Sequence, residues 1–225
     1  PLEPRLVFGN YPAVIHLKTN REKRHYLTKL VHHYMTHDVL PNKSKEEYAK
    51  LNNLFRLVSY LIGHEFFYKE MEKKVALKKE KIDDYMCLFT ELRLIYKLTG
   101  FKEKLDKEVG KSSIWYFLDN GIRNAVINNF NPLGVRDDTD KLWKNYLISE
   151  RIKKQSYKNM KISNFFWRTY DQQELDLVEQ TDSSLRGYQF TWHKKSLKPP
   201  LAWQKAYPHA DFQVIHRENY LEWIS

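Results

Sequence analysis

The 225-residue chain contains little cysteine and little glycine, and each scarcity excludes a class of protein. Its single cysteine, Cys87, cannot form an internal disulfide and is typical of a reducing compartment. None of its seven glycines belongs to a phosphate-binding loop. Gly110-Lys111-Ser112 resembles the end of such a loop, but Leu105 stands where the loop requires its first glycine. We therefore predict that this chain does not hydrolyse ATP by itself.

Long apolar runs are missing as well. No run approaches the length of a membrane span, and the first twelve residues, PLEPRLVFGNYP, lack the apolar core of a signal peptide. We therefore predict a cytoplasmic protein that does not contact a membrane. Apolar residues make up 42% of the chain and aromatic residues 15%, which is enough for two small domains.

The net charge of +10 suggests attraction to nucleic acid, but the charge is spread along the chain. Residues 1–40 contain six basic and three acidic side chains. Residues 41–120 contain 16 and 13, and residues 121–225 contain 16 and 12. These totals favour weak attraction to polyanions over a dedicated binding patch.

The first forty residues combine a short apolar segment with a basic helix. Leu6–Ile15 is predicted to be a short strand, interrupted by a glycine and a proline. Thr19 and Glu22 have the spacing of a capping box, so a helix is predicted from there to about Val39. The apolar face of this helix would consist of Leu27, Leu30, Val31 and Tyr34.

Two histidines of this helix have the spacing of a zinc-binding pair. His33 and His37 are four residues apart and share a helix face. No second pair of ligands follows them, so a solvated helix face is the favoured interpretation.

Residues 45–120 have the element order of a winged helix. Helices are predicted at 46–62, 67–75 and 78–94, followed by strands at 95–98 and 114–118 with a charged loop between them. In a winged helix the third helix can enter the DNA major groove and the loop can touch the backbone. The candidate DNA-binding residues are Lys78, Lys79, Lys81, Lys102, Lys104 and Lys107. Acidic residues interrupt both groups, however, and winged helices also serve as protein-binding modules, so both interpretations stay open.

The last hundred residues alternate between helices and strands. Helices are predicted at 142–154, 201–207 and 218–224, and strands at 165–169, 174–179, 185–192 and 212–215. Because alternate residues of a strand share a face, Glu174 and Asp176 would project together, as would Gln189 and Thr191.

This order of a helix, three strands, a helix and a strand resembles the core of PD-(D/E)XK nucleases. The resemblance implies that Asp176 occupies the position of the metal-binding aspartate, and that Glu150 on the preceding helix is the candidate for a further acidic ligand of Mg²⁺. Gln189 and Thr191 stand where the family has Glu-x-Lys, and neither supplies the charge that metal-assisted phosphodiester attack requires. Glu150, Glu174, Asp176 and Gln189 therefore form a degenerate catalytic set, with Asp176 as the candidate metal ligand.

The whole chain resembles the C-terminal region of an uncharacterised group of prokaryotic AAA-type ATPases. The stretches that carry the resemblance are GNYPAV (9–14), YMTHDVL (34–40), YFLDNGIRNA (116–125), LWKNYLISERIK (142–153) and FWRTYDQQELDLV (166–178). Such families carry an acid where this chain has Lys144. The resemblance implies an ATPase module upstream of residue 1, which would contain the Walker motifs and bind ATP.

From these observations we expect an α+β protein of three parts. Residues 1–40 would form an ATPase-proximal strand and helix, residues 41–120 a winged-helix domain, and residues 121–225 a PD-(D/E)XK nuclease-like domain. The expected function is that of a non-catalytic accessory region that binds nucleic acid or a protein partner. One alternative is a weak metal-dependent DNA nuclease using Glu150, Glu174 and Asp176, with Lys194 or Lys195 replacing the missing lysine. The other is a protein-interaction or oligomerisation module.

Overall fold

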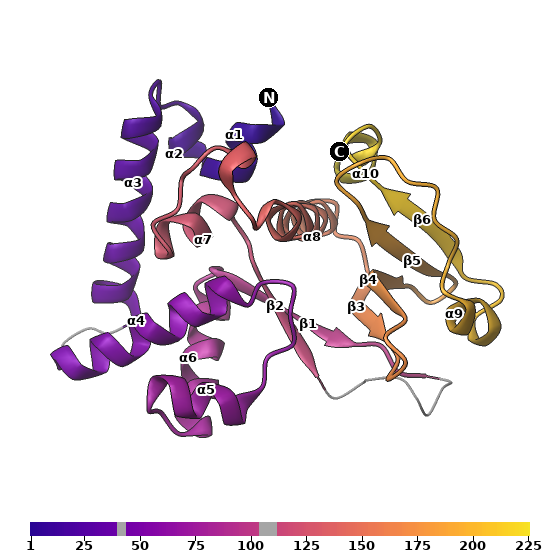
Figure 1. The fold of residues 1–225 in the computed structure, drawn as a ribbon, viewed down its shortest axis with the longest axis horizontal. Helices are drawn as coiled ribbons and strands as arrows, with labels where there is room; N and C mark the ends of the chain where they lie inside the picture. Colours follow the sequence, from indigo (N-terminus) through magenta and orange to yellow (C-terminus); the bar gives the residue numbers. More distant parts are fainter. Residues whose placement is uncertain (40–43, 104–111) are drawn as a thin grey trace. The chain divides into compact units, whose positions relative to one another are not determined.

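A computed structural model describes residues 1–39, 44–103 and 112–225 of the chain. It confirms an α+β protein, with helices and a six-stranded mixed sheet in the order β2-β1-β3-β4-β5-β6 (Figure 1). The chain divides into two compact units. Unit 1 contains residues 1–96 and 115–146, and unit 2 contains residues 97–114 and 147–225. The three domains expected from the sequence stay a prediction.

Unit 1 is largely helical. Its helices before the sheet are α1 (Leu2–Phe8), α2 (Pro12–Ile15), α3 (Asn20–His33), the π-helix η1 (Tyr34–Val39), α4 (Lys45–Tyr60), α5 (Tyr68–Val75) and α6 (Lys79–Glu91). Strands β1 (Ile95–Gly100) and β2 (Ser113–Phe117) follow, and then α7 (Asn120–Val126) and the 3-10 helix η2 (Leu133–Val135). Helix α8 (Thr139–Tyr157) contributes residues to both units.

The strand expected at Leu6–Ile15 was wrong, because this segment forms the end of α1 and all of α2. Pro12 is the first residue of α2, where its missing N–H costs nothing, and its fixed φ suits a helix. Leu6, Val7 and Phe8 are three consecutive buried residues. A short apolar run of this kind has no periodicity that distinguishes a buried helix from a strand.

The helix that the sequence marked with a capping box at Thr19 begins where it was expected, and a second box at Ser44 was not predicted. Thr19 and Ser44 each accept a backbone N–H three residues on, and Glu22 and Glu47 reach back in complete capping boxes. The three helices α4, α5 and α6 and the two strands confirm the predicted element order, while the winged-helix assignment stays a prediction. Their apolar faces form one core, which includes Leu51, Leu54, Phe55, Val58, Met71, Ile82, Phe89, Ile95 and Phe117.

Asp119 joins the turn after α1 to the start of α7. Its Oδ1 accepts the N–H of Ile122 at 3.1 Å, which caps α7, and its Oδ2 accepts the N–H of Asn10 at 2.7 Å. Gly121 lies so close to α1 that a Cβ atom there would stand 2.2 Å from the carbonyl oxygen of Phe8. The stretches 9–14 and 116–125, which carry the family resemblance, are therefore needed for folding.

A buried arginine cluster follows in unit 1. Arg123 is 1% exposed; its Nε donates to the carbonyl of Ser59 at 2.9 Å, and its guanidinium forms an ion pair with Asp138. Arg136 binds the same carboxylate, with Nε 2.7 Å from Oδ1. Burial raises the pKa of Asp138, but the two guanidinium groups outweigh this effect and lower the pKa from 3.8 to about 2.

Unit 2 contains the remainder of the sheet. Strands β3 (Ser163–Arg168), β4 (Glu174–Gln180) and β5 (Leu185–Phe190) pair antiparallel, and β6 (Asp211–Ile215) pairs parallel with β5. The helices α9 (Leu201–Ala206) and α10 (Tyr220–Ile224) precede and follow β6. This confirms the predicted order of a helix, three strands, a helix and a strand.

Helix α9 packs on the face of the sheet that carries Gly187. A Cβ atom at Gly187 would lie 2.6 Å from Cδ1 of Leu175, which would have to move, and 3.4 Å from Trp203, which is an ordinary contact distance. The core on this face contains Phe101, Trp167, Leu175, Val178, Trp203 and Tyr207. Among the described residues, no helix combines the length and apolarity needed to cross a membrane.

We predict that Gly121→Ala destabilises the protein because its Cβ would displace the backbone of Phe8. The expected loss of unfolding free energy in urea is about 2 to 3 kcal/mol. Gly134→Ala is the matched control, since a Cβ there meets nothing within 4 Å and the expected change is within about 0.5 kcal/mol. Equal effects of the two substitutions would contradict the close contact between α1 and α7.

We also predict that Asp138 contributes to stability in a pH-dependent way. Because its folded pKa is lowered, the contribution is present above about pH 4 and is lost as the pH falls towards about 2. The loss should amount to about 2 kcal/mol of unfolding free energy. The ¹³C shift of the Asp138 carboxyl group should have its titration midpoint near pH 2; a midpoint near the ordinary value of 3.8 would contradict the arginine cluster.

Candidate functional site

Asp176, the candidate metal ligand, lies on β4 beside the end of β5. Its Oδ2 accepts the backbone N–H of Phe190 at 2.7 Å. Val178 of β4 is paired with Gly187 of β5. Between Val178 and Leu175 the register with β3 shifts by one residue, so the regular alternation of side chains is interrupted at Asp176.

The other two acidic candidates are held by basic neighbours. Glu174 Oε2 lies 2.6 Å from Nη2 of Arg168 on the adjacent strand. Glu150 Oε1 lies 2.7 Å from Nζ of Lys153, three residues further along α8. The described residues contain no group of three or more histidine, cysteine or acidic side chains that could hold a metal ion. Mg²⁺ is usually bound by one or two carboxylates and keeps several waters. Each of the three candidate carboxylates already binds another group of the protein, so the set does not fit the ion.

The lysines that were expected to replace the missing catalytic lysine lie in an exposed segment after β5. Nζ of Lys194 is 3.3 Å from Oε2 of Glu218, and both side chains are largely exposed. Lys195 is exposed as well.

Unit 2 contains one polar cluster that sequence reasoning missed. Glu179 of β4 is 3% exposed and binds Arg151 of α8 through two hydrogen bonds, Nε–Oε1 at 2.5 Å and Nη2–Oε2 at 2.7 Å. Gln155 donates to Oε1 at 2.8 Å, and the hydroxyl of Tyr188 donates to Oε2 at 3.1 Å. Arg151 also donates to the carbonyl of Trp223 at 2.7 Å, which ties α10 to α8.

The electrostatics of this cluster favour a structural role. Burial lowers the pKa of Arg151, but its hydrogen bonds and ion pair with Glu179 outweigh burial and raise the pKa above the ordinary value. The pKa of Tyr188 is raised mainly by burial and, to a smaller extent, by the charge of Glu179. Both groups therefore keep their protons at neutral pH, and the cluster holds α8, β4, β5 and α10 together.

The sequence contained one signal for this cluster. Glu179 stands two residues after the buried Leu177, on the same face of β4. An acidic residue in such a position requires a buried cationic partner, because an unpaired buried carboxylate is costly. The sequence did not indicate that Arg151 is that partner.

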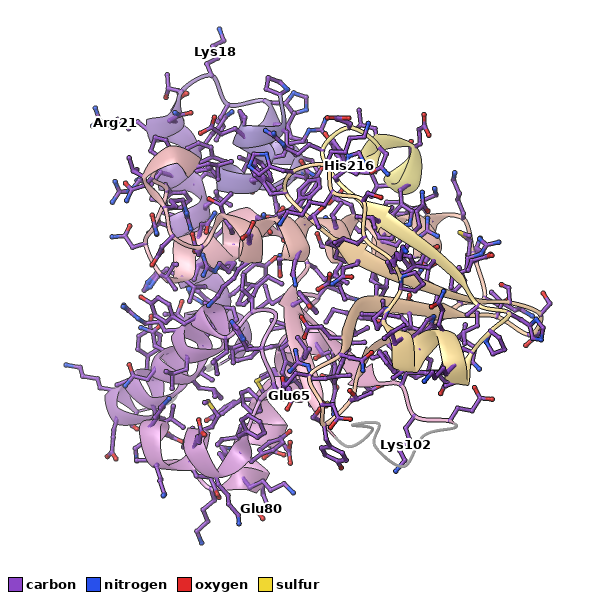
Figure 2. The ribbon with its side chains drawn as sticks, turned by 45° about the vertical axis from the view of Figure 1, so that its right-hand side comes forward. Lys18, Arg21, Glu65, Glu80, Lys102 and His216 are labelled. Carbon is purple, nitrogen blue, oxygen red and sulfur yellow. The ribbon has the colours of Figure 1, made fainter. Side chains whose placement is uncertain are left out.

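The basic candidates of the winged-helix region lie at the start of α6. Lys78 precedes the helix and is exposed, while the ammonium groups of Lys79 and Lys81 lie over the rings of Tyr68 at 5.3 Å and Tyr85 at 5.0 Å. Lys102 is exposed after β1 and is labelled in Figure 2. Lys104 and Lys107 lie outside the described residues.

Helix α5 adds lysines that sequence reasoning did not single out. The two helices are linked by a hydrogen bond from the N–H of Lys79 to Oε1 of Glu72, at 2.8 Å. We call the basic residues of both helices and the turn between them, all exposed except the half-buried Lys81, the α5–α6 lysine surface. It consists of Lys69, Lys73, Lys74, Lys78, Lys79 and Lys81.

Two acidic residues beside this surface are bound to neighbours, while Glu70, Glu80 and Asp84 are exposed. Glu72 binds a backbone N–H, as described above. The pKa of Tyr68 is raised mainly by burial and, to a smaller extent, by a hydrogen bond with Asp83. Asp83 is therefore also bound to a neighbour. The rings of Tyr68 and Tyr85 attract the ammonium groups of Lys79 and Lys81, which stay charged.

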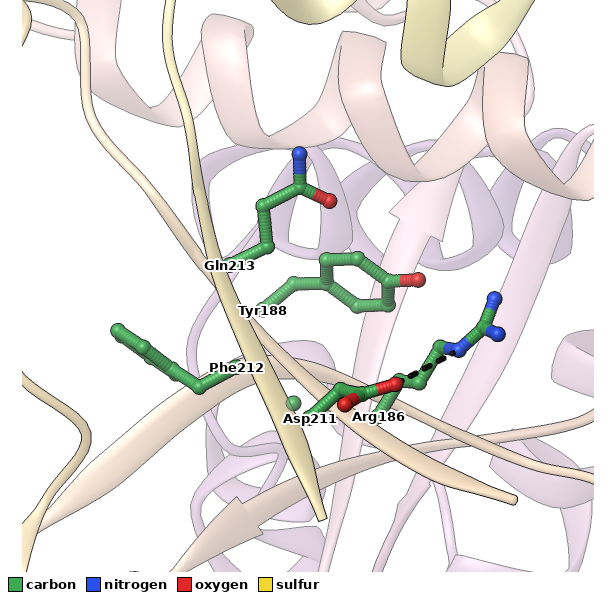
Figure 3. Close-up of a pocket in the computed structure, with 6 residues that line it drawn as sticks. Arg186, Tyr188, Asp211, Phe212 and Gln213 are labelled. Carbon is green, nitrogen blue, oxygen red and sulfur yellow. Dashed lines mark ion pairs between the residues drawn. The ribbon is translucent and has the colours of Figure 1, made fainter.

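A shallow hollow of about 310 Å³ lies along β5 and β6 (Figure 3). At its end, Arg186 Nε lies 3.4 Å from Asp211 Oδ2, and both side chains are more than half exposed. Tyr188 also lines the hollow, and its hydroxyl donates a hydrogen bond to Glu179. The lining residues are Arg186, Gly187, Tyr188, Asp211, Phe212 and Gln213.

Two protein families match the chain, one after the other. The family described as Domain of unknown function (DUF8612) matches residues 2–133, which is more than half of the chain. The family described as Domain of unknown function (DUF4143) matches residues 139–219. No curated protein and no solved structure matches the chain.

We predict that Glu179→Gln destabilises the protein strongly, because it leaves the charge of Arg151 buried without a counter-ion. The expected loss is about 3 to 5 kcal/mol of unfolding free energy in urea. Glu174→Gln removes a more exposed ion pair of the same type and should cost at most about 1 kcal/mol. Similar losses in both variants would contradict the structural role of the Arg151 cluster.

Proposed function

The chain belongs to the DUF8612 family, and from this premise we propose that it is a non-catalytic accessory region of an AAA-type ATPase that binds nucleic acid. Residues 139–219 match DUF4143, a domain often found at the C-termini of AAA-type ATPases. In this proposal the ATPase module, with its Walker motifs and bound ATP, lies upstream of the chain. The accessory region delivers nucleic acid to that module.

The observation that carries the proposal is the α5–α6 lysine surface. Six lysines lie between residues 69 and 81, where the acidic residues are Glu70, Glu72 and Glu80, and the rest of α6 adds Asp83, Asp84 and Glu91. Within the part of the chain that the structure describes, no carboxylate pairs with the ammonium groups of Lys78, Lys79 or Lys81. Unpaired lysines are available to displace counter-ions from phosphates.

The order of the elements supports the same surface. Helices α4, α5 and α6 followed by β1 and β2 have the order of a winged helix, in which the third helix contacts DNA. The lysines at the start of α6 then stand at the end of the helix that approaches the groove.

The state of the acidic residues supports a non-catalytic role for the nuclease-like part. Glu150 and Glu174 are ion-paired, Asp176 accepts a backbone N–H, and Gln189 and Thr191 carry no charge. Metal-assisted hydrolysis requires charged ligands that can both hold a cation and activate water. In this proposal the sheet of unit 2 serves as a scaffold.

We predict that the protein binds duplex DNA with a steep dependence on salt. Lys78→Gln, Lys79→Gln and Lys81→Gln together should weaken binding by about tenfold or more at low salt. They should also reduce the slope of log K against log salt by about 2 to 3, because each lost phosphate contact removes about 0.9 from it. Fluorescence anisotropy of a labelled duplex measures both quantities.

The matched control replaces three exposed lysines of unit 2, Lys161, Lys198 and Lys205, by glutamine. The change of net charge is the same, so an equal loss of affinity would show that only the total charge matters and would contradict the proposed surface. Absence of DNA binding at any salt concentration would favour the protein-interaction alternative. Cleavage of DNA with Mg²⁺ or Mn²⁺ that Asp176→Asn abolishes would establish the nuclease alternative instead.

A further inference from the structure

Helix α3 carries a row of basic side chains that the proposed function does not use. Arg21, His25, Lys29, His33 and His37 follow one another at intervals of four residues, and all five are exposed. Residues four apart lie above one another on a helix surface. The rings of His33 and His37 are stacked with centroids 4.6 Å apart, so the row continues from α3 into η1. We call these five residues the α3 row.

The surroundings of the row are also basic. Lys18, Arg24 and His32 are exposed beside it, and Lys18 and Arg21 project away from the molecule in Figure 2. Five of the nine histidines of the chain lie between residues 16 and 37. The one acidic residue of α3 is Glu22, whose Oε2 is bound by the N–H and hydroxyl of Thr19 at 2.9 Å each.

The elements packed against α3 contribute little charge of the opposite sign, whereas α4 and α6, which pack against η1, carry the acidic residues Glu46, Glu47, Glu80, Asp83, Asp84 and Glu91. Helix α2 has no charged residue, and the only charged residue of α7 is Arg123, which is buried with Asp138. Helix α1 contributes Arg5 and Glu3, whose Oε1 accepts the N–H of Leu133. Besides His37, η1 contains Asp38 as its charged residue. Among the described residues, no carboxylate forms an ion pair with the α3 row.

Protonation therefore places like charges at successive positions of the row, which turns by about 40° around the helix at each step. Histidine is the side chain that becomes charged as the pH falls from about 8 to about 5. Like charges four residues apart destabilise a helix. A polyanion lying along the row would remove this repulsion, so acid should strengthen its binding.

The geometry of the row fits a line of phosphates. Four helical residues rise by about 6 Å, and the row extends over about 24 Å. One strand of duplex DNA carries a phosphate for about every 3.4 Å of its axis, so side chains along the row can reach a succession of phosphates. A membrane surface fits less well, because an interfacial helix inserts its apolar face. The apolar face of α3 is packed on the core through Leu27, Leu30 and Val31.

We infer that the α3 row is a second DNA contact, which binds the phosphate backbone of a duplex more tightly as the pH falls. The inference rests on the proposed function in that the ligand is the same nucleic acid. It adds a surface and a form of regulation that the α5–α6 lysine surface does not contain. The three histidines of the row supply the pH dependence, while Arg21 and Lys29 supply charge at every pH.

The test measures the affinity of the 225-residue protein for a labelled duplex at about pH 8 and about pH 5.5. The wild-type protein should bind about tenfold more tightly at the lower pH, because three added charges each strengthen phosphate attraction by a few-fold. Substitution of His25, His33 and His37 by glutamine should abolish most of this increase and leave the affinity at about pH 8 unchanged. Arg21→Gln with Lys29→Gln should weaken binding at both pH values.

The matched control replaces two exposed histidines of unit 2, His193 and His209, by glutamine and should keep the full pH dependence. Circular dichroism at both pH values checks that each variant is folded. A pH dependence that survives the substitution of His25, His33 and His37 would overturn the inference. Equal pH-dependent binding of vesicles containing phosphatidylserine, without DNA binding, would also overturn it.

The two proposals fail in different ways in this experiment. If the lysines of α6 are needed for binding but the pH has no effect, the inference fails and the proposed function stands. If binding depends on the pH and on the three histidines but not on the lysines of α6, the inference stands and the α5–α6 surface is wrong. If no DNA binds at either pH, both fail.

Discussion

A buried arginine strongly destabilises the fold when the carboxylate that neutralises its charge is removed. Each unit of this protein contains a buried arginine–carboxylate pair. Arg123 with Asp138 in unit 1 and Arg151 with Glu179 in unit 2 are nearly excluded from water, and both arginines also bind backbone carbonyls. The cost of burying each charge is offset only when every donor has its acceptor. The pairs therefore allow few alternative packings of the helices around them.

Two motifs of the family resemblance serve this packing directly. Asp119 caps α7 and at the same time holds the turn after α1, while Gly121 provides the space that α1 needs. Buried polar groups that are fully bonded make good structural residues and poor catalysts, because their partners hold them in one state. The basic side chains have the opposite distribution, since the lysines of α5 and α6 and the α3 row all lie on the surface. This division favours a protein that binds a polyanion over one that transforms it.

The helices were predictable to within a few residues because their signals are local. Capping boxes at Thr19 and Ser44 and the 3.6-residue period of the apolar faces depend only on near neighbours in the chain. The segment Leu6–Ile15 lacked such a period, and its helices form because Leu6, Val7 and Phe8 are buried by α7 and α3.

The sequence by itself determined the order of the elements, the α+β class and the basic character of the surface, because periodicity, caps and charge are properties of short segments. Only the tertiary structure decided which charged groups meet. It paired Glu179 with Arg151, 28 positions away, and Asp119 with Asn10, 109 positions away. It also stacked His33 on His37, which extends the α3 row into η1. Such contacts depend on how distant segments pack, and no local pattern contains that information.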